Sequence, residues 1–244
     1  MNKTYTNAIK NLIFICSCIL VLSACKKEKV PEKENISVVK NTFTIHGTLK
    51  NFHPQEVYLN KIIENSIYVI DSSKVKNNTF SFKGFVEYPE RFAISFKQYS
   101  STVILIVENA DITITIDAND FENTPIEGSK LNSEFKNYQL NSKKIFKKIT
   151  YLFPQFQKYR LENNANQLAD ISRQMKEIEQ EYVDFSYNYI AQNNNSYIAA
   201  IILRDQLKNT KIDTLKIINS YNKLTDSIKK SPDAHIIALT LNLH

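Results

Sequence analysis

The sequence predicts an α+β chain, in which an antiparallel β-sandwich or open barrel is followed by an all-α helical module. Between residues 42 and 117 apolar and polar residues alternate, which is the period of half-buried strands. After Pro125 and Gly128 the apolar residues recur every three or four positions, which is the period of amphipathic helices. We therefore expect a β domain over residues 41–129 and a helical module over residues 130–244.

Residues 1–24 have the layout of a secretory signal peptide. Two lysines precede an apolar run over residues 12–22, and this run is about half the roughly 20 residues that a membrane-spanning helix needs. The run ends in Leu22-Ser23-Ala24-Cys25, which resembles the bacterial lipobox. That resemblance implies cleavage between Ala24 and Cys25 and lipidation of Cys25, whereas an ordinary signal peptide with an incidental cysteine is the alternative. Two or more acyl chains hold a protein stably on a membrane.

Residues 25–40 are expected to form a flexible tether, because they combine Pro31 with alternating charges. Lys26, Lys27 and Lys29 directly follow the cysteine, where they can contact anionic headgroups. No aspartate follows Cys25, which by analogy with bacterial sorting favours the outer membrane. We expect a chain that faces the periplasm, with exposure at the cell surface as the open alternative.

Short strands are expected in the β domain, separated by turn residues such as His53-Pro54 and Asn77-Asn78. Residues 112–116 alternate isoleucine with threonine. Residues 103–107 form a continuous apolar run, which is typical of a central strand covered on both faces. Further apolar positions of the alternation are Phe43, Ile45, Leu49, Val57, Leu59, Ile67, Val69, Phe80, Phe82, Phe92, Ile94 and Phe96.

A long helical hairpin is expected next, with its break at residues 163–166 and a bend near Pro154. Two further helices are expected at residues 196–207 and 212–229, and residues 234–243 are apolar and nearly strand-like. The aromatic residues of the hairpin favour core packing over a ligand-stacking surface. The apolar stripes consist of Ile145, Ile149, Leu152, Phe156 and Tyr159, and of Leu168, Ile171, Met175, Ile178, Tyr182, Phe185 and Tyr189.

The order and spacing of several short motifs resemble one lipoprotein family. These motifs are residues 43–47, 57–59, 70–75, 79–84, 88–90, 108–114 and 126–129. Together they resemble the family called domain of unknown function 4369, which is typical of Bacteroidota, over residues 41–129. In many members this region precedes a thioredoxin-like domain with a CxxC pair, which is expected to be missing here. The resemblance therefore implies an accessory or binding module.

Composition excludes several kinds of chemistry. The chain has 244 residues and only three glycines, Gly47, Gly84 and Gly128, so no two glycines can share a phosphate-binding loop. Its three cysteines, Cys16, Cys18 and Cys25, all lie within the first 25 residues, so no redox pair or cysteine-ligated zinc is expected in the remaining chain. No catalytic or cofactor-binding residue and no cofactor are predicted.

Other candidate residues favour structural roles. The histidines, at positions 46, 53, 235 and 244, have no histidine three or four residues away, so we expect no metal site. Asp71 is followed by two serines but has no nearby histidine to act as a base, so a turn is favoured. Lys143, Lys144, Lys147 and Lys148 form a basic patch, for which headgroups, acidic glycans or solvent are better partners than nucleic acid.

The sequence thus predicts a non-catalytic, membrane-anchored envelope lipoprotein that acts as a binding or accessory module. Its expected partners are the membrane, through the lipid on Cys25, and an envelope protein or a thioredoxin-like protein. The alternative is an auxiliary part of a thiol-disulfide oxidoreductase whose catalytic domain lies on a separate chain or was lost by truncation.

Overall fold

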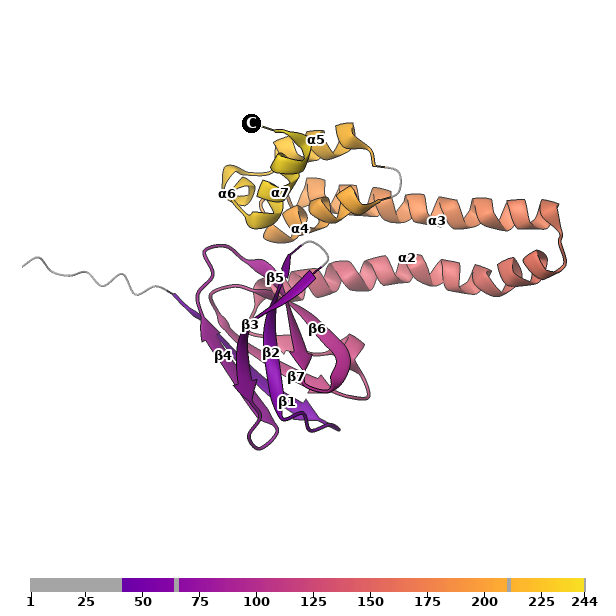
Figure 1. Ribbon diagram of the computed structural model, residues 1–244. Helices are drawn as coiled ribbons and strands as arrows, with labels where there is room; N and C mark the ends of the chain where they lie inside the picture. Colours follow the sequence, from indigo (N-terminus) through magenta and orange to yellow (C-terminus); the bar gives the residue numbers. More distant parts are fainter. Residues whose placement is uncertain (1–40, 64–65, 210–211, 244) are drawn as a thin grey trace, which may run out of the picture. The chain divides into compact units, whose positions relative to one another are not determined.

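The computed structural model describes residues 41–63, 66–209 and 212–243, and it confirms the α+β class (Figure 1). Strands precede helices along the chain, and the strands form two sheets without a closed barrel. The strands are β1 (Phe43–Lys50), β2 (Glu56–Ile63), β3 (Ser66–Lys74), β4 (Thr79–Gly84), β5 (Glu90–Phe96), β6 (Tyr99–Val107), β7 (Asp111–Asp117) and β8 (Ile126–Glu127).

The two sheets have the strand orders β4-β1-β7-β8 and β3-β2-β5-β6. Their inner faces share one apolar core, which includes Ile45, Leu59, Ile94, Leu105 and Ile114. Most neighbouring strands pair antiparallel as expected, but β1 and β7 pair parallel, with Ile45 opposite Ile112. The expectation came from short turns between consecutive strands, and such turns do not constrain two strands that lie far apart in the sequence.

Strand β6 contains the apolar run at residues 103–107, and it lies at one end of its sheet rather than in the centre. Leu105 and Val107 belong to the core between the sheets, whereas Ile106 packs into a second core with the helices. An apolar run therefore indicates that both faces of a strand are covered, even when the strand lies at the edge of its sheet. Here the second sheet covers one face, and helices cover Ile106 on the other.

Helices α2 and α3 form the expected hairpin (Figure 1). The side chain of Ser129 caps α2, and the side chain of Asn164 caps α3. Pro154 lies within α2, which continues to Leu161. The helices are α2 (Lys130–Leu161), α3 (Ala165–Gln192), α4 (Tyr197–Asp205), α5 (Thr214–Lys223), α6 (Asp226–Lys229) and α7 (Pro232–Leu241), with 3₁₀ turns at η1 (Phe121–Asn123) and η2 (Gln206–Lys208).

Two expectations for the last part of the chain are wrong. The helix predicted over residues 212–229 is interrupted, because the backbone of Leu224 is extended and its side chain is buried. Residues 234–243 are not a strand but lie in and just after α7, which begins at Pro232 and is capped by the Ser231 hydroxyl. Serine followed by proline is a helix start signal, and burial of Ala234 and Ile237 explains the apolar pattern that resembled a strand.

Helix α4 lies at the centre of the second core. Its residues 198–203 are all buried, and residues of α2, α3, α5 and α7 pack around them. No helix among the described residues is long and apolar enough to span a bilayer.

Candidate docking surface

The predicted lipidation site lies outside the described residues. Cys25 and Ala24 both precede residue 41, as do Cys16 and Cys18. Lipidation and signal cleavage therefore stay predictions from the sequence.

The histidines that the structure describes lie far apart in the fold. His46 is exposed on β1 and His235 is exposed on α7. The His53 ring nitrogen Nδ1 lies 2.9 Å from the side-chain oxygen of Asn78. Within residues 41–63, 66–209 and 212–243, no three histidine, cysteine, aspartate or glutamate side chains are grouped in a way that could hold a metal ion.

Asp71 was expected to lie in a turn, but it lies in strand β3. Its carboxylate accepts a hydrogen bond of 2.7 Å from the backbone N–H of Ser72. Leu59 pairs with Asp71 and Asn60 pairs with Val69, so Ile70 is an extra residue in β3. This β-bulge explains how turn-like bonding occurs inside a strand.

The basic patch on α2 is partly neutralised within the chain. Lys143 forms an ion pair of 2.7 Å with Glu122, and Lys148 forms one of 2.6 Å with Glu181. Both pairs are exposed, so each is worth at most about 1 kcal/mol.

Two motif residues that support the family resemblance hold the β domain together. The Glu108 carboxylate accepts hydrogen bonds from the Ser129 hydroxyl, at 2.5 Å, and from the backbone N–H of Leu131, at 3.2 Å. The Asn109 side chain exchanges two hydrogen bonds with the backbone of Val86. These residues therefore have structural roles at the start of α2 and at the end of β6.

Asn132 closes the outer edge of strand β6. Its side-chain oxygen accepts from the N–H of Ile106 at 2.8 Å, and its Nδ2 donates to the Ile106 carbonyl at 2.6 Å. The amide thus makes the two bonds that a neighbouring strand would make. Because Asn132 is buried, the outward backbone groups of Ile106 are unavailable to another chain.

Two ion pairs lie near the contact of β5 with the helices. Arg91 of β5 donates two hydrogen bonds to the Asp205 carboxylate, at 2.8 and 2.9 Å. Burial alone would lower the pKa of Arg91, but the hydrogen bonds and charge of Asp205 raise it, so the guanidinium stays charged. Arg204 and Asp233 form a second pair, which is buried, at 2.8 Å.

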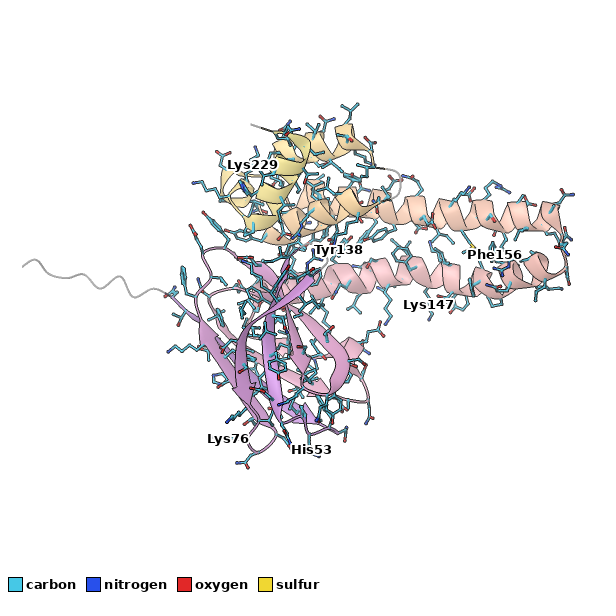
Figure 2. The ribbon with its side chains drawn as sticks, in the orientation of Figure 1. His53, Lys76, Tyr138, Lys147, Phe156 and Lys229 are labelled. Atoms are coloured by element: carbon cyan, nitrogen blue, oxygen red, sulfur yellow. The ribbon has the colours of Figure 1, made fainter. Side chains whose placement is uncertain are left out.

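The aromatic residues at the base of the hairpin pack against one another, as the sequence predicted. Tyr138 stacks on Phe185 with ring centroids 5.2 Å apart, and its hydroxyl lies 2.8 Å from that of Ser186. Figure 2 shows Tyr138 on the side of α2 that faces α3. Burial raises the pKa of Tyr138 far above its usual range. These aromatic side chains therefore belong to the second core.

Strand β3, at the other end of the sheet that β6 terminates, has an open edge. Within the described residues β3 pairs with β2 alone. Ile67, Tyr68, Val69 and Ile70 are each at least half exposed, and Val69 reaches 60%. We name these four residues the apolar edge. The alternating pattern predicted Ile67 and Val69 to be covered, and that prediction is wrong.

A signal for the apolar edge exists in the sequence, since four consecutive apolar residues cannot all face one core from a strand. The sequence does not reveal which elements cover the two faces of this strand, and no element within residues 41–63, 66–209 and 212–243 buries any of the four side chains. In a two-stranded pairing, every second residue of β3 directs its backbone N–H and C=O away from β2. The apolar edge therefore combines free backbone groups with exposed apolar side chains, which is the arrangement that accepts an added strand.

Charges lie at one end of the apolar edge. Asp71 is exposed directly after Ile70, and Lys74, the last residue of β3, is exposed three positions further on and forms no ion pair among the described residues. Lys61 of β2 is paired instead with Glu90 of β5, at 2.8 Å. This end therefore favours a strand that carries a basic residue opposite Asp71 or an acidic residue opposite Lys74.

Residues 43–135 match the family model described as Domain of unknown function (DUF4369). The match includes all eight strands and ends at Phe135, within the second turn of α2. A comparison with curated proteins found no match.

Proposed function

We propose that this chain, whose residues 43–135 form a DUF4369 domain, is a non-catalytic, membrane-anchored envelope lipoprotein that binds an extended segment of a partner protein along β3. The apolar edge is the observation that carries the binding part of the proposal. Natural sheets usually protect their edges with charges, prolines or covering elements, because an open apolar edge recruits other strands. Here the edge has none of these over residues 67–70.

The anchoring part of the proposal rests on the sequence. Leu22-Ser23-Ala24-Cys25 follows an apolar run of signal-peptide length, and Cys25 is the acceptor for lipid. Residues 26–40 can span at most about 50 Å when fully extended. A tether of this length would keep the domain near the membrane while leaving β3 accessible to a second envelope protein.

The proposed occupant of β3 is an extended peptide segment with apolar residues at alternate positions and an acidic residue near one end. Its backbone would bond the free groups of β3, and its apolar side chains would cover Ile67 and Val69 on one face and Tyr68 on the other. Its acidic residue would lie opposite Lys74, the last residue of β3. Backbone bonds supply affinity in this mode, and the side chains supply specificity.

The anchor is tested by substituting Cys25→Ala in the full chain and separating membrane from soluble fractions. Release of the variant from the membrane fraction supports lipidation, since the signal-peptide run remains intact. Retention of the variant in the membrane fraction would contradict it. Mass spectrometry of the wild-type N-terminus gives an independent readout of the acyl groups.

Strand addition is tested by photo-crosslinking in cells, with a photoreactive residue at position 67 or position 69 of the full chain. We expect adducts at both positions, to partner residues that lie two apart in the partner sequence, because paired strands advance together. Position 239 is the matched control, since Leu239 is equally exposed but lies on α7. Adducts at 239 to the same partner, or none at 67 and 69, would refute the proposal.

The identity of the crosslinked partner also decides between the two roles that the sequence predicted. A thioredoxin-like protein would assign this chain to the auxiliary part of a thiol-disulfide oxidoreductase. Any other envelope protein would assign it to a separate binding role. Addition of Ile67→Lys to the chain with the photoreactive residue at 69 should abolish the adduct, whereas Leu239→Lys should not.

A further inference from the structure

The far part of the hairpin, residues 143–161 of α2 and 165–184 of α3, is poorly covered. We name this part the arm. Ile171 is the one arm residue, within these described ranges, whose side chain is buried. Tyr151 and Leu161 are 66% and 81% exposed. Two helices alone bury little apolar surface, and bundles of four are the common stable solution.

One flank of the arm is hollowed. A groove of about 460 Å³ is lined by Lys148, Tyr151, Leu152, Gln174, Glu177, Ile178 and Glu181. Its floor is apolar, with Leu152 from α2 and Ile178 from α3, and Tyr151 stands exposed at its rim. We name this side of the arm the groove flank.

The two helices carry opposite charge. Helix α2 has eight basic residues and one acidic residue, whereas α3 has five acidic and two basic residues. Figure 2 shows Lys147 on the side of α2 away from α3, so the basic residues are not confined to the contact between the two helices. The arm therefore presents a basic ridge beside an acidic ridge.

Basic residues of α2 and acidic residues of α3 also lie side by side at the same level, that is, at the same distance from the base of the arm. Lys148 pairs with Glu181, and the ring centroids of Phe146 and Tyr182 are 4.6 Å apart. These two contacts show which residues of α2 lie beside which residues of α3. By the same spacing, Lys144 lies level with Asp184, one turn nearer the base.

Toward the tip, Lys158 lies level with Asp170. We name these four charged side chains the outer charges. Within one chain they contact other groups: Lys144 contacts Asn141, Asp184 contacts Lys216, Lys158 pairs with Glu162, and Asp170 pairs with Arg173. Asn141, Glu162 and Arg173 are exposed and Lys216 is partly exposed, and the four outer charges are themselves exposed, so they stay accessible to a second molecule.

We propose that the groove flank binds the groove flank of a second copy of this chain. The two arms lie face to face with their tips in the same direction, related by a twofold axis along the arm. Helix α2 of each copy then lies against α3 of the other, so Lys144 faces Asp184 and Lys158 faces Asp170 across the interface. Tyr151 of each copy covers the apolar floor of the other groove at the level of Ile178.

The charges favour this arrangement over other pairings of the same surface. If the tips pointed in opposite directions, α2 would face α2 and lysine would face lysine, which is unfavourable. A second copy also supplies both ridges at once, as a self-complementary twofold interface requires.

The size of the surface is sufficient for a dimer. Nineteen helical residues are about 30 Å long and two helices are about 20 Å wide. Two such faces bury roughly 1,200 Å² in total, above the roughly 1,000 Å² expected of a specific interface.

Crosslinking between differently tagged full-length copies tests the interface. One copy carries Lys144→Cys and the other carries Asp184→Cys, and a short bis-maleimide joins cysteines that lie close together. We expect a product that contains both tags. Thr150→Cys with Glu179→Cys is the matched control, since both residues are exposed and face away from the groove flank. No product from the first pair, or equal yields from both pairs, would overturn the proposal.

Charge exchange tests the pairing of the ridges. One variant carries Lys144→Glu with Lys158→Glu, and the other carries Asp170→Lys with Asp184→Lys, so the Lys148–Glu181 pair within each chain is kept. Each variant alone should self-associate at least tenfold more weakly than the wild-type chain, because like charges meet at four places. An equal mixture should regain association, because each altered ridge then meets its opposite, and this recovery also shows that both variants fold.

Unchanged self-association of either variant, or no recovery in the mixture, would overturn the proposal. The inference goes beyond the proposed binding at β3, and its outcome is separable from it. The crosslink between arms requires neither the lipid nor the apolar edge. Retention of Cys25→Ala in the membrane, or absence of adducts at position 69, would therefore leave the arm result unaffected.

Discussion

Among the asparagines of α2, Asn132 should cost the protein the most stability when it is replaced by alanine. The wild-type side chain makes both hydrogen bonds to Ile106 and a third to Ser129, at 2.8 Å. Alanine removes all three at a position where only 4% of the wild-type residue is exposed. The N–H and C=O of Ile106 then have no partner.

The expected loss follows from those two orphaned groups. A buried backbone group without a partner costs about 1–3 kcal/mol, so the pair costs about 2–6 kcal/mol. Alanine is the better helix former by about 0.6 kcal/mol, which offsets a small part. The net loss of about 1.4–5.4 kcal/mol is a large share of the roughly 5–15 kcal/mol by which single domains are stable.

The assay is urea unfolding of the full chain, followed by circular dichroism. Asn141→Ala is the matched control, because Asn141 is exposed on the same helix, where its side chain donates to the Asn137 carbonyl and accepts from the exposed Lys144. The control should change the free energy of unfolding by less than about 0.5 kcal/mol. A loss below about 1 kcal/mol for Asn132→Ala would refute the argument that this amide replaces a neighbouring strand.

Three further changes have defined outcomes. Gly128→Ala should lower the urea midpoint by the equivalent of at least about 1 kcal/mol, because Gly128 has φ of +78° and an added Cβ would lie 2.0 Å from the Asp111 carbonyl oxygen; an unchanged midpoint would contradict this. Arg204→Met should cost about 3–5 kcal/mol, because it leaves Asp233 charged and buried, and adding Asp233→Leu should recover much of that loss in the same urea assay. Alkaline pH should unfold the base of the hairpin, because burial raises the pKa of Tyr138 and Tyr189 in the folded state, and the hydrogen bond to Glu134 raises that of Tyr189 further. Their contribution to stability is complete below the unfolded tyrosine pKa of about 10 and is lost as the pH rises above it. Tyrosinate absorbance should therefore appear together with the loss of helical dichroism, and full ionisation of the tyrosines in a folded chain would show that these two hydroxyls are not protected.

The sequence predicts the main division of the fold because each half has its own periodicity. Residues 112–116 alternate strictly and form β7, and the stripe at residues 168–189 forms α3. Local periodicity reports the element and the number of covered faces. It does not report which strands become neighbours, so the parallel pairing of β1 with β7 and the edge position of β6 were beyond it.

The docking surface was harder to predict for the same reason. Ile67 and Val69 have the pattern of a covered strand, and their exposure depends on β3 lying at the end of its sheet. The arm differs in this respect, because its charge asymmetry is visible in the sequence of α2 and α3. The structure adds that Lys148 lies beside Glu181. Without this alignment of α2 with α3, the basic residues of one copy cannot be assigned to the acidic residues of another.

The boundary of the β domain is set by contacts and not by the end of the last strand. The sequence placed it at residue 129, whereas the family match runs to residue 135. The difference includes Leu131, Asn132 and Phe135, which pack with or bond Ile106 of β6. The family match therefore includes the first turns of α2, and the arm begins beyond them.

The two edge strands of one sheet, β6 and β3, differ in how they are covered, and this difference supports binding at β3. At β6 a single buried amide, Asn132, satisfies the outward backbone of Ile106, and helices cover its side chain. The chain thus closes the β6 edge at Ile106 with one side chain, so an open edge at β3 is not forced on it by the size of the domain. At β3 four apolar residues stay exposed in succession, although a lysine or proline among them would protect the edge. Exposed apolar surface favours association or aggregation unless a partner covers it, and an extended segment that pairs with β3 would cover both the backbone and the side chains.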